Sequence, residues 1–254
     1  MYVEHEIKLR LSPKAAAKLR RLAALRPLRT GPPVTRRLNS TYFDTPGFGF
    51  RDNEMALRVR RIGRRRIQTL KLPGHGALGV QAFHEYEADV QGDRPELKGL
   101  GDKTLRARLV RAGLAKGLEP VFVTEFDRHT VPVRVGTSEI ELAVDQGEIR
   151  AGGRSVPICE AELELRSGRI EDLFKLAMLL HEQVPFSLEG RTKAARGYGL
   201  LAGEAPRGQG QAARAAARGN GRPELRCRDA GRPRSPAGKR GGGAGGGRSK
   251  ASTR

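Results

Sequence analysis

Charged and apolar residues alternate with a period of two along several stretches of this chain, which limits the folds it can adopt. Across residues 3–11, Glu4, Glu6, Lys8 and Arg10 occupy the even positions, and most odd positions are apolar. Because successive side chains of a strand point to opposite faces, this pattern predicts a strand with one charged and one apolar face. The same alternation recurs at residues 57–60, 69–72, 85–90, 139–145 and 159–166.

The charged faces of these strands must point either to water or into a polar interior. A single strand of this kind usually exposes its polar face to water. Here acidic rows such as Glu160, Glu162 and Glu164 coexist with basic rows such as Arg58 and Arg60, and like charges along one face repel each other. If the sheet closes into a barrel with helices on its apolar outside, both kinds of row line one interior tunnel.

Helices are fewer than strands in this sequence. Ser12 and Pro13 form an N-cap and a first turn that lead into a helix over Lys14 to Leu25. Further helices are expected over residues 102–112, 170–183 and 193–201. Strands with a few helices indicate the α+β class.

The end of the chain differs in composition from the rest. Residues 203–254 hold 13 Lys or Arg residues against three acidic ones, together with 13 Gly and 10 Ala. Such a segment cannot bury enough apolar area to offset its chain entropy, so we predict one folded domain over residues 1–202 and a disordered tail over 203–254. The tail is a solvated extension, a binder of nucleic acid or another polyanion, or the altered end of a longer protein.

Composition excludes several classes of protein. The chain has 254 residues and two cysteines, so disulfides do not form its scaffold. Its longest apolar run lies near residues 176–180, far below the roughly 20 residues of a membrane-spanning helix. The first residues also lack the basic start and apolar run of a signal peptide. We therefore expect a cytoplasmic protein without a membrane partner.

A tunnel that carries both acids and bases suits a metal ion bound to a polyanion. Carboxylate oxygens hold hard divalent cations, whereas Lys and Arg bind phosphate oxygens, Arg through its planar guanidinium. The formal net charge of +20 also favours an anionic substrate.

An ordered set of short motifs carries a family resemblance. Glu4-His5-Glu6-Ile7-Lys8 has the spacing ExExK. Matching elements follow at residues 42–46, 57–60, 69–71 and 85–87, at Arg128, and at residues 145–147, 160–164 and 192–197. Over roughly residues 2–202 the chain resembles the CYTH family of triphosphate tunnel metalloenzymes, and within it the bacterial inorganic triphosphatases.

The resemblance implies an eight-stranded antiparallel β-barrel that releases the terminal phosphate of inorganic triphosphate with Mg²⁺ or Mn²⁺. The implied catalytic residues are Lys8, Arg58, Arg60 and Glu85. The residues implied to bind the phosphates are Lys8, Arg58, Arg60, Lys71, Arg128 and Lys193. The implied metal ligands are Glu4, Glu6, Asp145, Glu160 and Glu162. Glu87 and Glu164 are expected to line the tunnel.

The sequence departs from the family pattern at two positions, and other functions stay open. Phe83 stands where members often carry Arg, and Thr192 replaces the usual Ser before Lys193. A class IV adenylate cyclase or a thiamine triphosphatase would share the fold, although the charged faces show no aromatic cluster for an organic group. A polyphosphate- or RNA-binding protein without enzymatic activity would explain the cations but not the acidic rows.

Overall fold

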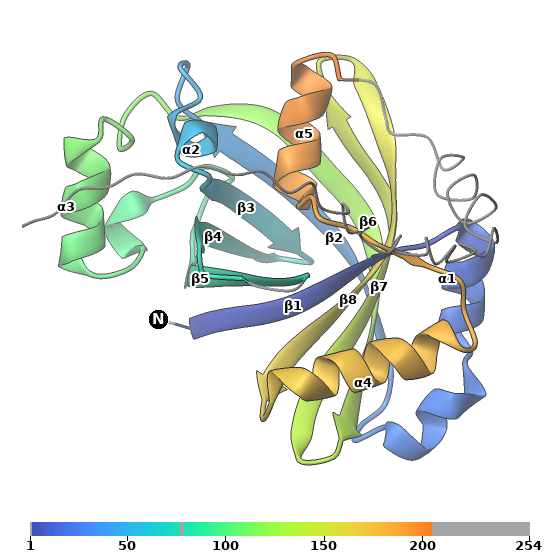
Figure 1. The fold of residues 1–254 in the computed structure, drawn as a ribbon. Coiled ribbons are helices and arrows are strands. Elements are labelled where there is room, and N and C mark those ends of the chain that lie inside the picture. The colour runs from blue at the N-terminus through green and yellow to red at the C-terminus, as the bar shows by residue number, and fades with distance from the viewer. Residues whose placement is uncertain (1, 77–78, 205–254) are drawn as a thin grey trace, which may run out of the picture. The chain divides into compact units, whose positions relative to one another are not determined.

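The structure is a computed structural model that describes residues 2–76 and 79–204 (Figure 1). Its strands are β1 (Tyr2–Arg10), β2 (Val34–Asp44), β3 (Ala56–Ile62), β4 (Arg65–Pro73), β5 (Val80–Asp89), β6 (Glu119–Val135), β7 (Ser138–Ala151), β8 (Arg154–Ser167) and β9 (Ser187–Leu188). Its α-helices are α1 (Pro13–Arg20), α2 (Gly49–Asp52), α3 (Lys103–Arg111), α4 (Ile170–His181) and α5 (Lys193–Leu201). Two 3₁₀ helices, η1 (Ala23–Leu28) and η2 (Leu97–Gly99), complete this part of the chain.

Strands β1 to β8 form a closed antiparallel barrel. The strand order is β5-β4-β3-β2-β6-β7-β8-β1, and β5 also pairs with β1, which closes the sheet. The two-residue strand β9 pairs with β1 at Leu9 and Arg10. The predicted eight-stranded antiparallel barrel is confirmed, and the register places Lys8 directly opposite Glu162.

The apolar faces of the strands point outward, as the alternation predicts. Ile7 and Leu9 of β1 are buried in one cluster with Leu19 of α1 and Leu173 and Leu176 of α4. On another side of the barrel, α3 packs on the outward residues of β3 and β4, so that Leu57, Leu70 and Leu105 share a cluster. Helices therefore cover the apolar outside, and the charged faces point inward.

One end of the barrel interior is apolar, which the sequence analysis does not predict. Ile149 lies on the same face of β7 as Asp145, and Phe126 lies on the same face of β6 as Arg128, because the residue numbers in each pair differ by an even number. Phe126 and Ile149 are fully buried in a cluster with Tyr198 of α5. Helix α5 contacts β6, β7 and β8, beside which it lies in Figure 1, and thus packs on inward faces and not on the outside.

The first helix is shorter than predicted. Helix α1 ends at Arg20, not at Leu25, and the 3₁₀ helix η1 follows it. The chain turns because Leu22 has an extended backbone, with φ of −61° and ψ of 117°. This turn lets both Leu22 and Leu25 reach the core on which α1 packs. The helices predicted over 102–112, 170–183 and 193–201 are confirmed within two residues at each end.

The predicted disordered tail, residues 203–254, lies outside the described residues except for Gly203 and Glu204. Within residues 2–76 and 79–204, each helix is too short or too polar to span a lipid bilayer.

Gly147 allows two neighbouring strands to approach each other closely. A Cβ atom at this position would lie 2.1 Å from the carbonyl oxygen of Glu125 and 2.5 Å from the Cα atom of Phe126, which pairs with Gly147 across β6 and β7. We expect Gly147→Ala to lower the free energy of unfolding by at least about 2 kcal/mol, measured by denaturant titration. Gly47→Ala is the matched control, since a Cβ there has nothing within 4 Å and should leave stability unchanged. Equal stability of the two variants would contradict the close approach.

Candidate functional site

All the residues predicted to form the site converge in the barrel interior. They come from every side of it: Glu4, Glu6 and Lys8 (β1), Arg58 and Arg60 (β3), Lys71 (β4), Glu85 (β5), Arg128 (β6), Asp145 (β7), Glu160 and Glu162 (β8) and Lys193 (α5). Most of them line a cavity of about 1260 Å³, together with Glu87 and Glu164. Asp145 and Glu160 lie deeper, fully buried behind the lining. The closed sheet thus brings residues from distant parts of the sequence into one charged chamber.

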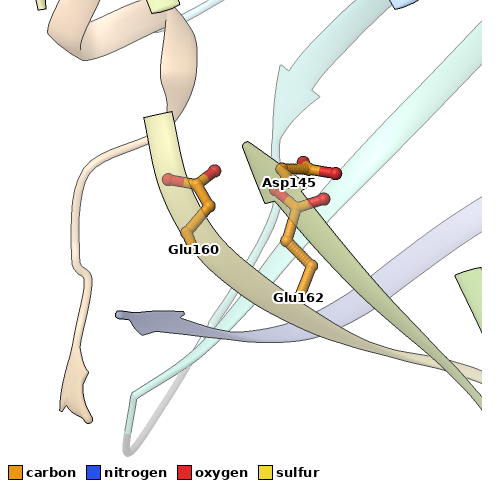
Figure 2. A group of neighbouring side chains, drawn as sticks. All are labelled: Asp145, Glu160 and Glu162. Carbon is orange, nitrogen blue, oxygen red and sulfur yellow. The ribbon is translucent and has the colours of Figure 1, made fainter. Parts of the chain in front are cut away.

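Asp145, Glu160 and Glu162 form a carboxylate trio. Asp145 and Glu160 face each other across the β7–β8 pairing, and Glu162 follows two residues later on the same face of β8. One carboxylate oxygen of each lies within 4.8 Å of the others, and all three side chains are buried. Figure 2 shows the three side chains gathered on neighbouring strands. Oxygen donors at this spacing could hold a hard divalent cation.

Two basic side chains from other parts of the fold, Lys193 of α5 and Arg128 of β6, form ion pairs with the trio. The Nζ atom of Lys193 lies 2.6 Å from an oxygen of Asp145, 2.5 Å from one of Glu160 and 2.9 Å from one of Glu162. The guanidinium of Arg128 donates to both oxygens of Asp145, at 2.8 and 2.7 Å, and also contacts Glu162. Burial alone would raise the pKa of Asp145, but Arg128 and Lys193 lower it, so this carboxylate is ionised.

The two acids of β1 lie apart from the trio. Glu6 accepts a hydrogen bond of 2.9 Å from Lys8, which also lies 3.1 Å from Glu162. Glu4 pairs with Lys71 at 2.5 Å, and Lys71 pairs with Glu85 at 3.0 Å. The five acids predicted as metal ligands therefore divide into the trio and a separate pair on β1, with Lys8 between them.

The opposite wall, on β3, carries two guanidinium groups with little compensating negative charge among the described residues. Arg60 donates to the Ser40 hydroxyl at 3.2 Å, and among the described residues no carboxylate pairs with it. Burial and the neighbouring Arg58 and Arg128 lower the pKa of Arg60 to about 9, so it stays charged at neutral pH. Arg58 reaches Glu85 only at 4.0 Å. This wall is an excess of positive charge that faces the cavity, where an anion would relieve the repulsion.

The chemistry of the trio fits a divalent metal. Its three carboxylates are buried and close together, and carboxylate oxygens are the ligands that Mg²⁺ or Mn²⁺ prefers. On β1, burial raises the pKa of Glu4 to about 7 despite its pair with Lys71. A buried acidic cluster that could bind a metal is thus present.

Several site residues carry no assignment from the sequence. Arg196 contacts Glu160 at 2.5 Å, and its spacing of three from Lys193 on a helix is a signal that could have found it. Tyr42 lines the cavity beside Arg58, which its even position on β2 would have indicated. Phe83 also lines the cavity, and its ring centroid lies 4.4 Å from the Nζ atom of Lys71.

Asp44 connects the barrel to α5. Its fully buried carboxylate accepts hydrogen bonds from the backbone N–H groups of Phe50 and Arg51, at 2.8 and 3.1 Å, and caps α2. It also accepts a bond of 2.7 Å from the hydroxyl of Tyr198. Because Tyr198 is on the helix that begins at Lys193, this contact helps to hold that lysine over the trio.

Comparison with known proteins agrees with this architecture. The chain is 31% identical over 202 residues to an inorganic triphosphatase of Haemophilus influenzae, an alignment that covers 78% of this chain and 55% of that protein. The chain thus spans about half the length of this curated relative. Among solved structures it resembles a candidate adenylyl cyclase from Hippeastrum with a dominant triphosphatase activity, at a TM-score of 0.54 and 21% identity, over 80% of this chain and 98% of the other.

The family model described as "CYTH domain" matches residues 3–198, which is most of the chain and all of the barrel except Tyr2. The match includes ExExK on β1, the basic row on β3 and the acidic row on β8, whose charged side chains lie in the barrel interior. This chain therefore belongs to the CYTH domain family.

Proposed function

We propose that this protein hydrolyses the terminal phosphoanhydride bond of inorganic triphosphate inside its barrel, with Mg²⁺ or Mn²⁺. The observation that carries the proposal is the half-buried guanidinium of Arg60, which lies among other cations without a carboxylate partner in the described residues. A cation that is partly shielded from water and close to other cations is unfavourable unless a ligand supplies the opposite charge. The likeness to a triphosphatase supports the same reading.

The two walls of the cavity divide the work. Arg58, Arg60 and Lys71 would bind the phosphate chain and stabilise charge that develops on its oxygens, while Arg128 and Lys193 would reach it from the side of the trio. Phosphoryl transfer passes through a loose transition state, so positioning and charge stabilisation account for most of the catalysis.

The acids have a different role in the proposal. The trio of Asp145, Glu160 and Glu162 would hold a divalent cation, with Glu4 and Glu6 available for a second one. Such a cation would neutralise phosphate charge and act as a Lewis acid. Burial would raise the pKa of Glu85, but Lys71 and Arg58 lower it by more, so Glu85 is ionised at neutral pH and could orient the attacking water by accepting a hydrogen bond from it.

A phosphate-release assay tests the proposal. We expect tripolyphosphate to be hydrolysed with Mg²⁺ or Mn²⁺ and the rate to fall to background in EDTA, because the carboxylates cannot approach the phosphates without a cation between them. ATP and thiamine triphosphate, measured in parallel, should react far more slowly.

The assay needs a control for contaminating phosphatases. Arg58→Ala, purified in the same way, should lose activity by orders of magnitude with its fold intact, measured by circular dichroism. Preferential turnover of ATP or thiamine triphosphate would favour an enzyme for organic triphosphates. Tight binding of tripolyphosphate without turnover would favour a binding protein.

A further inference from the structure

The ammonium group of Lys193 pairs with the same carboxylate oxygens that would have to bind a metal ion. Its Nζ atom is within 2.9 Å of all three members of the trio, and its side chain is 7% exposed. The ammonium group therefore takes the central position among the three carboxylates. A divalent cation and this ammonium cannot both lie there, because they would repel each other at close range.

The charges around the trio are already balanced. Four carboxylates, those of Glu6, Asp145, Glu160 and Glu162, form one connected network of ion pairs. Four cations pair with them, namely Lys8, Arg128, Lys193 and Arg196. A divalent cation added to this neutral network would leave two uncompensated positive charges in a buried region, which is unfavourable.

We propose that Lys193 is a displaceable counter-ion of the trio, which makes the binding of a divalent cation there conditional on the triphosphate. This proposal rests on the proposed function and adds that binding of the cation is coupled to binding of the triphosphate. A triphosphate in the cavity brings the missing negative charge. Lys193 and Arg128 both line the cavity, so each can exchange a carboxylate for a phosphate oxygen and leave the trio free.

The attachment of α5 is suited to such an exchange. Lys193 is the first residue of the helix, and the Thr192 side chain caps it through the N–H of Ala195 at 3.0 Å. The other end is held by Tyr198, whose hydroxyl bonds to Asp44 and whose ring packs edge-on against Phe122. The helix can stay in place while the long lysine side chain changes its partner.

Binding of Mn²⁺ without any triphosphate tests the counter-ion role. Titrations with Mn²⁺, followed by calorimetry or by the electron paramagnetic resonance signal of free Mn²⁺, should show weak binding to the wild type. Lys193→Met keeps the length of the side chain and removes its charge, so it should bind Mn²⁺ at least tenfold more tightly, which corresponds to about 1.4 kcal/mol. Lys193→Arg keeps the charge and should bind as weakly as the wild type.

Two further variants assign the effect to the trio. Adding Asp145→Asn to Lys193→Met should cancel the gain in affinity. Lys175→Met removes a lysine of α4 that pairs with Asp172 outside the cavity, and it should change nothing. If Lys193→Met is unfolded, Mn²⁺ should restore its fold during refolding, because the metal replaces the missing cation. A variant that neither binds Mn²⁺ more tightly than the wild type nor regains its fold with Mn²⁺ overturns the proposal.

The dependence on triphosphate is measured by equilibrium dialysis with diimidotriphosphate, which resists hydrolysis. This analogue should increase the Mn²⁺ retained by the wild type, and it should increase it less in Lys193→Met. Equal increases would reject the coupling. Hydrolysis of tripolyphosphate by the wild type tests the proposed function separately, since an inactive wild type whose Lys193→Met variant gains Mn²⁺ affinity would refute the function alone.

Discussion

Arg60→Met should lower kcat/KM for tripolyphosphate by about 10²- to 10³-fold, the range found when one preorganised donor to a developing anion is removed. Arg60 and Arg58 of β3 form the positively charged wall of the cavity that lies opposite the trio. The charge of Arg60 has no carboxylate partner among the described residues. Its charge is therefore available to the substrate alone. Steady-state assays with saturating metal measure the effect.

The same variant should not lose stability. A half-buried cation that is repelled by Arg58 and Arg128 opposes folding, and methionine fills much of the same space without the charge, so the melting temperature should stay equal or rise. Arg61→Met is the matched control, because Arg61 is the next residue on β3, is exposed, and belongs to the opposite face of the strand. A large loss of stability in Arg60→Met, or an equal loss of activity in Arg61→Met, would show that Arg60 serves the fold and not the substrate.

The difference between Arg60 and Arg61 shows what the sequence alone can predict, namely the face of the strand to which each side chain belongs. Strand alternation assigns adjacent residues to opposite faces, and the structure places Arg60 in the cavity and Arg61 on the surface. The same rule directs Glu4, Glu6 and Lys8 inward. Period-two patterning is a local property, so it predicts which side chains share a face without any knowledge of the tertiary structure.

Contacts between strands depend on register, which the pattern does not contain. Alternation alone could not predict that Lys193 would sit on Asp145, Glu160 and Glu162, because this contact joins a helix to two strands through the closure of the barrel. The apolar end of the interior escaped prediction for a related reason. Phe126 and Arg128 share one face of β6, and only the position of α5 explains why that face changes from charged to apolar.

Lys8→Met should lose both activity and stability, in contrast to Arg60→Met. Lys8 lies 2.9 Å from an oxygen of Glu6 and 3.1 Å from one of Glu162, and all three side chains are largely buried. Removal of the cation leaves two buried carboxylates with less compensation, which costs about 3 kcal/mol or more. For a domain of this size the melting temperature should fall by roughly 6 to 12 °C. Hydrolysis of tripolyphosphate should fall by orders of magnitude.

A second substitution separates the two effects. Glu6→Gln in the Lys8→Met background removes one of the uncompensated carboxylates, so the double variant should regain part of the lost stability. Activity should stay low, since the ammonium group that would contact the phosphates is still missing. Lys14→Met, on the exposed side of α1, controls for the loss of a lysine as such and should match the wild type in both measurements. If stability and activity return together in the double variant, Lys8 acts through the fold and has no direct part in phosphate binding.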